Sequence, residues 1–142
     1  MRFDCWRLFA RPRTLGQRGE AVAARFLKKK GYKILAQSYR TALGELDLVA
    51  VDPTDVRGST IIFAEVKTRK GTRAGYPEEA VDRRKQRKLS QLAEHYRAVH
   101  NVEAYPARFD VIAVEWPEQH KRPRVTHFPD AFDASLGDVM DG

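Results

Sequence analysis

Apolar residues recur along the first half of this chain with helical spacing and then with strand spacing. Between residues 15 and 30 they return every three or four positions until Gly31, which predicts a helix over 15–30. Thr14 and Gln17 have the spacing of a capping box at its start. Three apolar runs of strand length follow, at 32–40, 45–51 and 60–67. Their short connections favour an antiparallel meander.

The second half repeats the change from helical to strand spacing. A second helix is predicted to open at Pro77 and to carry its apolar stripe as far as Val99. Strands are predicted at 108–116 and, as an edge strand bracketed by prolines, at 124–128. A strand, helix, strand passage implies a right-handed crossover between parallel strands. The order αβββαβ(β) therefore predicts one α/β domain with a mixed central sheet and flanking helices.

Length and charge limit the classes of protein to consider. The 142 residues suit one domain over 15–132, with a basic aromatic arm at 1–14 and a tail at 133–142. A net charge of +7 favours a polyanionic partner: DNA, RNA or an acidic membrane. No apolar run spans a membrane and the first ten residues lack a signal-peptide core, so a cytoplasmic location is expected. Cys5 is the only cysteine, which excludes an internal disulfide.

Two charged residues interrupt the apolar run at 60–67. Glu65 and Lys67 are two positions apart in a predicted strand, so they project from one face near its end. Burying a carboxylate costs several kcal/mol unless a partner or a metal compensates it. The simpler interpretation is that the two residues neutralise each other; the alternative is an acid and a base that face a ligand.

A third charged residue, Asp47, interrupts the run at 45–51. Strand alternation places Asp47 on one face with Glu45, Val49 and Val51, and places Leu46, Leu48 and Ala50 on the other. Asp47 is therefore expected to face Glu65 of the neighbouring strand. Two adjacent carboxylates repel unless a cation lies between them, and Mg²⁺ or Mn²⁺ prefers such oxygen ligands.

Glu20 is an unexpected acid on an apolar helix face. It shares that face with Ala23, Ala24 and Leu27, so it is predicted to point inward toward Asp47. The alternative is an exposed acid that interacts favourably with the helix macrodipole. The pattern alone leaves both interpretations open.

Basic residues gather around these acids. Nine Lys and Arg residues lie between positions 67 and 88, against three acids, which suits phosphate contacts without sequence readout. The residues predicted to bind nucleic acid are Arg40, Arg69, Lys70, Arg73, Arg84 and Arg87. For any single one, an ordinary solvated surface is the alternative. The four histidines lack metal-site spacing, and no phosphate-binding glycine loop is present.

The order of an Asp and then a Glu-x-Lys on adjacent strands resembles the active site of the PD-(D/E)xK nucleases, although the proline that usually precedes the Asp is absent. Further motifs resemble the UPF0102 (YraN-type) family over about residues 15–132: Gly19-Glu20, Gly31-Tyr32, Tyr39-Arg40, Gly44-Glu45-Leu46-Asp47-Leu48, Glu65-Val66-Lys67-Thr68-Arg69 and Arg108-Phe109-Asp110-Val111. This resemblance implies a restriction-endonuclease-like fold related to Holliday-junction resolvases.

The resemblance also implies roles for the site residues. Asp47, Glu65 and the backbone carbonyl of Val66 are expected to hold Mg²⁺ or Mn²⁺, with Lys67 positioning the attacking water. Glu20 is expected to complete the acidic site.

We therefore predict a metal-dependent nuclease that acts on DNA, in particular branched or structured DNA. One alternative is a non-catalytic nucleic-acid-binding accessory module with the same fold, and another is an interaction protein whose acids are only structural. DNA cleavage separates the first two, and metal and DNA binding separate both from the third. A membrane partner is not expected, and a homodimer is left open.

Overall fold

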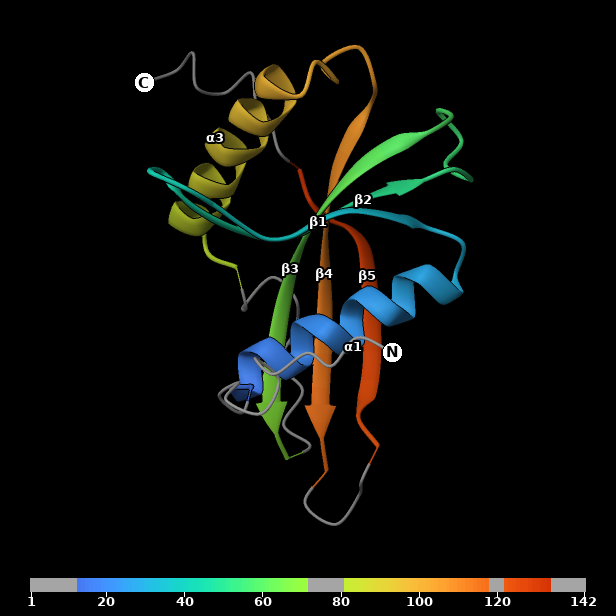
Figure 1. The fold of residues 1–142 in the computed structure, drawn as a ribbon, viewed down its shortest axis with the longest axis vertical. Helices are drawn as coiled ribbons and strands as arrows, with labels where there is room; N and C mark the ends of the chain where they lie inside the picture. Colours follow the sequence, from blue (N-terminus) through green and yellow to red (C-terminus); the bar gives the residue numbers. More distant parts are fainter. Residues whose placement is uncertain (1–12, 72–80, 118–121, 134–142) are drawn as a thin grey trace, which may run out of the picture.

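The computed structural model describes residues 13–71, 81–117 and 122–133. These residues form one mixed α/β arrangement with a five-stranded sheet in the order β1-β2-β3-β4-β5 (Figure 1). The elements are α1 (Leu15–Lys29), β1 (Lys33–Thr41), β2 (Gly44–Asp52), β3 (Thr60–Lys70), α3 (Arg83–Val99), β4 (Ala107–Trp116) and β5 (Arg124–Phe132). This order matches the predicted αβββαβ(β).

Strand directions confirm the predicted antiparallel meander and the predicted parallel pair. β1, β2 and β3 pair antiparallel in sequence, as an antiparallel meander does. β3 and β4 pair in parallel, with α3 between them along the chain, and β5 returns antiparallel to β4. A parallel pair needs a long crossover, which α3 supplies.

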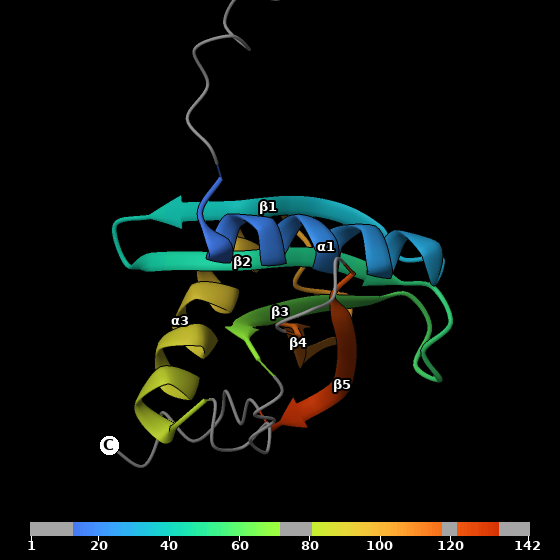
Figure 2. The same ribbon diagram turned by 90° about the horizontal axis from the view of Figure 1, so that it is seen from below.

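Alternate residues of β3 divide the core between the two faces of the sheet. Ile61 and Phe63 pack in a cluster with Leu92 of α3, whereas Ile62 packs in a second cluster with Leu27 of α1. Because strand side chains alternate between faces, α1 and α3 cover opposite faces. In Figure 1, α1 crosses β3 and β4. Both views place α3 beside the hairpin of β1 and β2 (Figure 1 and Figure 2). Neither helix of the described residues has the length and apolar character needed to cross a membrane.

A glycine brings α1 unusually close to β3. The capping box of Thr14 and Gln17 starts the helix as predicted. One turn later, a Cβ atom added to Gly19 would lie 1.9 Å from Oγ1 of Thr68 on β3. Only glycine fits at this crossing. The close approach sets the distance between the sheet and the next residue of the helix, Glu20.

The predicted boundaries differ most from the structure at the start of α3 and at the end of β5. α3 begins at Arg83, with the Asp82 side chain accepting a hydrogen bond from the Lys85 N–H, while Pro77 lies outside the described residues. The last strand continues past Pro129 to Phe132 rather than ending at residue 128. A register shift opposite β4, with Asp130 at φ +52°, accommodates the proline, as is common on an edge strand.

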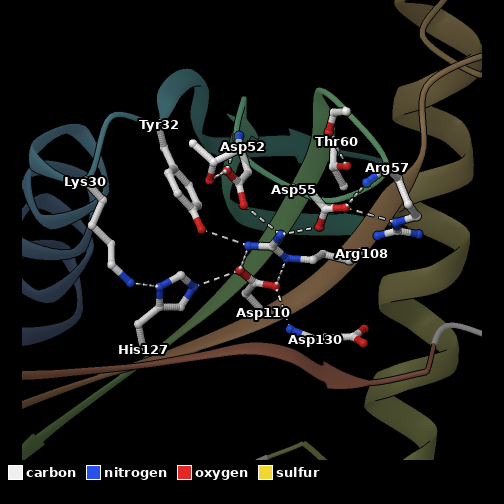
Figure 3. Close-up of polar contacts among 12 residues, drawn as sticks. Lys30, Tyr32, Asp52, Asp55, Arg57, Thr60, Arg108, Asp110, His127 and Asp130 are labelled. Carbon is white, nitrogen blue, oxygen red and sulfur yellow. Dashed lines mark hydrogen bonds and ion pairs between the residues drawn. The ribbon is translucent and has the colours of Figure 1, made fainter.

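A buried ionic network ties the β2–β3 connection to β4 and β5 (Figure 3). The Arg108 guanidinium donates to Asp52, Asp55 and Asp110 over distances of 2.8 to 3.1 Å. His127 Nε2 lies 2.7 Å from Asp110 Oδ2. The buried Asp110 carboxylate therefore has both Arg108 and His127 as side-chain partners. In register, Arg108 lies beside Ile62, so the network is on the α1 face of the sheet.

Candidate metal centre and catalytic site

The site forms where β2 and β3 separate. Their ladder runs from Asp52↔Thr60 to Leu48↔Ala64, and the next residue of β2 is Asp47. Its carboxylate Oδ2 accepts a hydrogen bond of 2.9 Å from the Val66 N–H of β3. The Asp47 side chain therefore bridges the two strands at the end of their ladder.

This arrangement corrects the predicted alternation along β2. Leu46 packs with Val49 in the α3-side cluster, whereas Leu48 and Ala50 pack in the α1-side cluster. Leu46 and Leu48 were expected to share a face. The alternation shifts by one residue at Asp47, which frees its side chain to turn toward β3.

Glu65 is the most enclosed acid of the site, and two ammonium groups approach it. Its side chain is 7% exposed, and Oε1 lies 3.8 Å from Lys67 Nζ and 3.5 Å from Lys85 Nζ. Lys67 is on the same strand, as predicted, whereas Lys85 reaches in from α3. The predicted Glu65–Lys67 pair is therefore present, together with a second cation.

The electrostatics of Asp47 show how close these acids are. Burial and then the negative charge of Glu65 raise the pKa of Asp47 to about 6, although the Val66 N–H and Lys85 oppose the shift. A raised pKa means that the ionised form of Asp47 is destabilised in this environment. A cation bound at this position would relieve that destabilisation.

Glu20 lies on the side of α1 that faces Asp47, which agrees with the inward one of the two interpretations that the sequence left open. Its Oε2 accepts a hydrogen bond of 2.7 Å from the hydroxyl of Ser38 on β1. Burial raises the pKa of Glu20, and the charges of Asp47 and Glu45 raise it further, while the Ser38 hydroxyl lowers it. Ser38 has φ +49°, a conformation that costs a non-glycine residue energy and turns its hydroxyl toward the helix.

Three acids can share one cation. Carboxylate oxygens of Glu20, Glu45 and Asp47 lie within 4.8 Å of one another. Oxygen atoms are the ligands that Mg²⁺ and Mn²⁺ prefer, so the donor set fits the predicted metal. Asp47 is the acid that joins this trio to Glu65.

The predicted phosphate-binding residues occupy several places around the site. Arg40 Nε lies 3.3 Å from Glu45 Oε2 and is largely exposed. The others in the described residues are the exposed Arg84 and Arg87 on α3 and the exposed Arg69 and Lys70 at the end of β3. Arg73 lies outside the described residues. The hairpin that carries Arg40 contacts α3, because the Lys88 side chain lies against the Gly44 turn.

Three residues of the site were not among those predicted. Glu45 shares a strand with Asp47 two positions away, and that acidic spacing was a usable signal. Lys85 interrupts the apolar stripe of α3, as Glu20 interrupts that of α1; the sequence placed it in that stripe and in the basic cluster but gave it no role at the site. Ser38 gave no signal, since its role depends on an irregular backbone conformation within β1.

Comparison with known proteins places the chain among relatives of similar length. A UPF0102 protein of Geotalea daltonii is 44% identical over 121 residues, which cover 85% of this chain and 91% of the relative. UPF0102 proteins of Symbiobacterium thermophilum (45% over 122 residues, 86% and 98%) and Caldanaerobacter subterraneus (42% over 121 residues, 84% and 95%) are also similar. Residues 19–114 match the profile described as "Uncharacterised protein family UPF0102", and they include every acid of the site. The chain belongs to this family.

Proposed function

We propose that this protein is a metal-dependent nuclease that hydrolyses phosphodiester bonds in DNA, with branched or otherwise structured DNA as the preferred substrate and the cytoplasm as its location. The observation that carries the proposal is the meeting of Asp47 with Glu65 where two strands separate, beside the ammonium group of Lys67. A carboxyl whose pKa is raised by burial and by a neighbouring carboxylate, next to a lysine, is typical of a site that binds a cation and a phosphate.

Each residue has a role that follows from its position. Asp47, Glu65 and the Val66 carbonyl would hold Mg²⁺ or Mn²⁺, with Glu20 assisting from α1 and Glu45 completing the oxygen donors. When bound, the metal supplies Lewis-acid activation of the phosphate and of the attacking water. Lys67 is on the same face as Glu65, so its ammonium can orient that water and offset negative charge on the phosphate.

Cationic side chains near the acids support DNA as the substrate. Arg84 and Arg87 are exposed on the helix that also carries Lys85, and Lys85 contacts Glu65. A DNA phosphate backbone that lies along α3 would therefore pass close to the acids. Contacts of this kind bind phosphates without reading sequence, which suits recognition of DNA by shape.

The test is cleavage of linear, flapped and four-way DNA with Mg²⁺ and with Mn²⁺. The parent should cleave at least one of them, and Asp47→Asn and Lys67→Ala should lose most of the cleavage while Lys67→Ala still binds DNA. Arg57→Gln, in the distant ionic network, is the matched control and should cleave like the parent. A parent that binds DNA but cleaves none of the three substrates with either metal would favour the accessory-module alternative.

A further inference from the structure

Lys85 is a cation on a helix face that is otherwise apolar. One turn further along α3, Leu89 is buried, and Leu92, Ala93 and Tyr96 continue the buried face. Lys85 Nζ lies 3.5 Å from Glu65 Oε1. This ammonium therefore has a specific carboxylate partner on β3 while part of its side chain remains in contact with solvent.

Glu65 thus has two monovalent partners where one would neutralise it. Lys67 is attached to the same strand two residues away, so its position is fixed by the sheet. Lys85 comes from a separate helix and its side chain is 44% exposed, so it can rotate into solvent without disturbing the core. The second ammonium is therefore the one that can exchange.

If a divalent cation bound to the same carboxylates, the second ammonium would no longer be needed to neutralise their charge. At the same distance, a divalent ion repels a nearby lysine twice as strongly as a monovalent ion does, and this repulsion weakens slowly with distance at a partly buried site. Asp47 is close enough for Lys85 to lower its pKa, so Lys85 faces both central acids.

We propose that Lys85 is an exchangeable counter-ion: it neutralises Glu65 when the site holds no divalent cation, and it offers its ammonium to a DNA phosphate when the site holds one. This inference rests on the proposed function and adds a regulatory coupling to it. Metal and DNA would then bind cooperatively, and the coupling would be reciprocal.

The first measurement is Mn²⁺ binding by calorimetry at pH 8, without DNA. Lys85→Gln should bind Mn²⁺ about three- to tenfold more tightly than the parent, because a competing positive charge is gone. Lys88→Gln is the matched control, since this lysine is on the same helix but lies against the Gly44 turn. Lys85→Arg should behave like the parent, because it restores the charge.

The second measurement is the gain in affinity for a four-way junction when Mn²⁺ is added, with intact DNA verified on a gel. The gain should be several-fold in the parent, in Lys88→Gln and in Lys85→Arg, and should largely disappear in Lys85→Gln. If Lys85→Gln matches the parent in both measurements, the counter-ion role is refuted while the proposed nuclease stands. If the parent binds no Mn²⁺, the proposed metal site fails, and the inference fails with it.

Discussion

The Val66 N–H donates a hydrogen bond of 2.9 Å to the Asp47 carboxylate, so an acidic side chain takes the place of a strand carbonyl where the β2–β3 ladder ends. This bond holds Asp47 at the level of the sheet, close to Glu65. The sheet therefore places two carboxylates together, and the charge of Glu65 still raises the pKa of Asp47 although Lys85 opposes the shift. The energetic cost of this arrangement leads to the first two predictions.

Replacing Asp47 with Asn should stabilise the metal-free protein at pH 8. Burial and Glu65 raise the pKa of Asp47 from 3.8 to about 6, so ionisation opposes folding. Stability from this group is complete below the unfolded pKa and is lost as the pH rises through about 6. Urea unfolding should show the variant more stable by about 2 kcal/mol at pH 8 and similar to the parent at pH 4. A variant that is less stable at pH 8 would contradict the repulsion.

Mn²⁺ affinity should depend on pH through the same group. A ligand carboxyl must lose its proton before it binds metal, and Asp47 has a pKa of about 6. We expect the Mn²⁺ association constant to be nearly constant above pH 7 and to fall by about tenfold per pH unit well below 6. Calorimetry in buffers of different ionisation enthalpy should detect the released proton. No fall between pH 6 and 5 would exclude Asp47 as a ligand.

The regular elements were predictable because each depends on local spacing. The capping box at Thr14 and the apolar period of α1 are local signals, and both are confirmed. The wrong boundaries depend on tertiary context: β5 passes Pro129 only because an edge strand can form a bulge there. The start of α3 at Arg83 follows from the Asp82 cap, which competed with an earlier Pro77 signal.

The site was predictable where a polar residue interrupts an apolar pattern. Asp47, Glu65 and Glu20 each do so, and the structure brings them together. The role of Ser38 and the shift of alternation at Asp47 depend instead on irregular backbone conformations, which the residue types at these positions do not predict. Strand periodicity alone assumes a regular strand, so it misplaced Leu46 at the one position where regularity ends.

Gly19→Ala should separate α1 from β3 and weaken the metal site. The added Cβ would lie 1.9 Å from Thr68 Oγ1, so the helix must move and carry Glu20 with it. We expect a loss of stability of about 1–3 kcal/mol, as for other overpacked contacts, together with weaker Mn²⁺ binding. Thr68→Ala should restore part of both losses in the double variant.

Gly16→Ala is the matched control for this substitution. It lies in the same helix, and a Cβ there meets only Thr14 Oγ1, at 3.9 Å. Thermal melting should show Gly16→Ala as stable as the parent or slightly more so, because alanine favours a helix over glycine. If Gly19→Ala behaves in the same way, the close crossing does not position Glu20.

Arg108→Gln should destabilise the protein strongly without changing the metal site. Arg108 is the shared partner of buried Asp52 and Asp110, and removing it leaves their charges uncompensated. The expected loss at pH 7 is about 3–5 kcal/mol. Burial would raise the pKa of Asp52, but hydrogen bonds from Thr54 and Arg108 outweigh it and hold the pKa at about 2.

The stability from Asp52 is therefore present above its unfolded pKa of about 4 and is lost as the pH falls through about 2. Urea unfolding should show the difference between Arg108→Gln and the parent shrinking as the pH falls below 4, where the orphaned acids protonate. Arg57→Gln, which removes only the pair between the half-exposed Arg57 and Asp55, should cost less than about 1 kcal/mol. Equal losses of stability in the two variants would show that the buried ion pairs of Arg108 do not stabilise the protein more than the Arg57 pair does.

The salt dependence of DNA binding should show whether the exposed arginines of α3 contact phosphates. If Arg84 and Arg87 each contact a phosphate, replacing either with Gln should reduce the slope of log K against log salt by about 0.9 on duplex DNA, because one fewer counterion is released. Sequence preference should not change. Arg25→Gln is the matched control, since Arg25 is also exposed but on α1, across the sheet. Anisotropy titrations at several salt concentrations give the slopes, and an unchanged slope in both α3 variants would remove this helix from the DNA-binding surface.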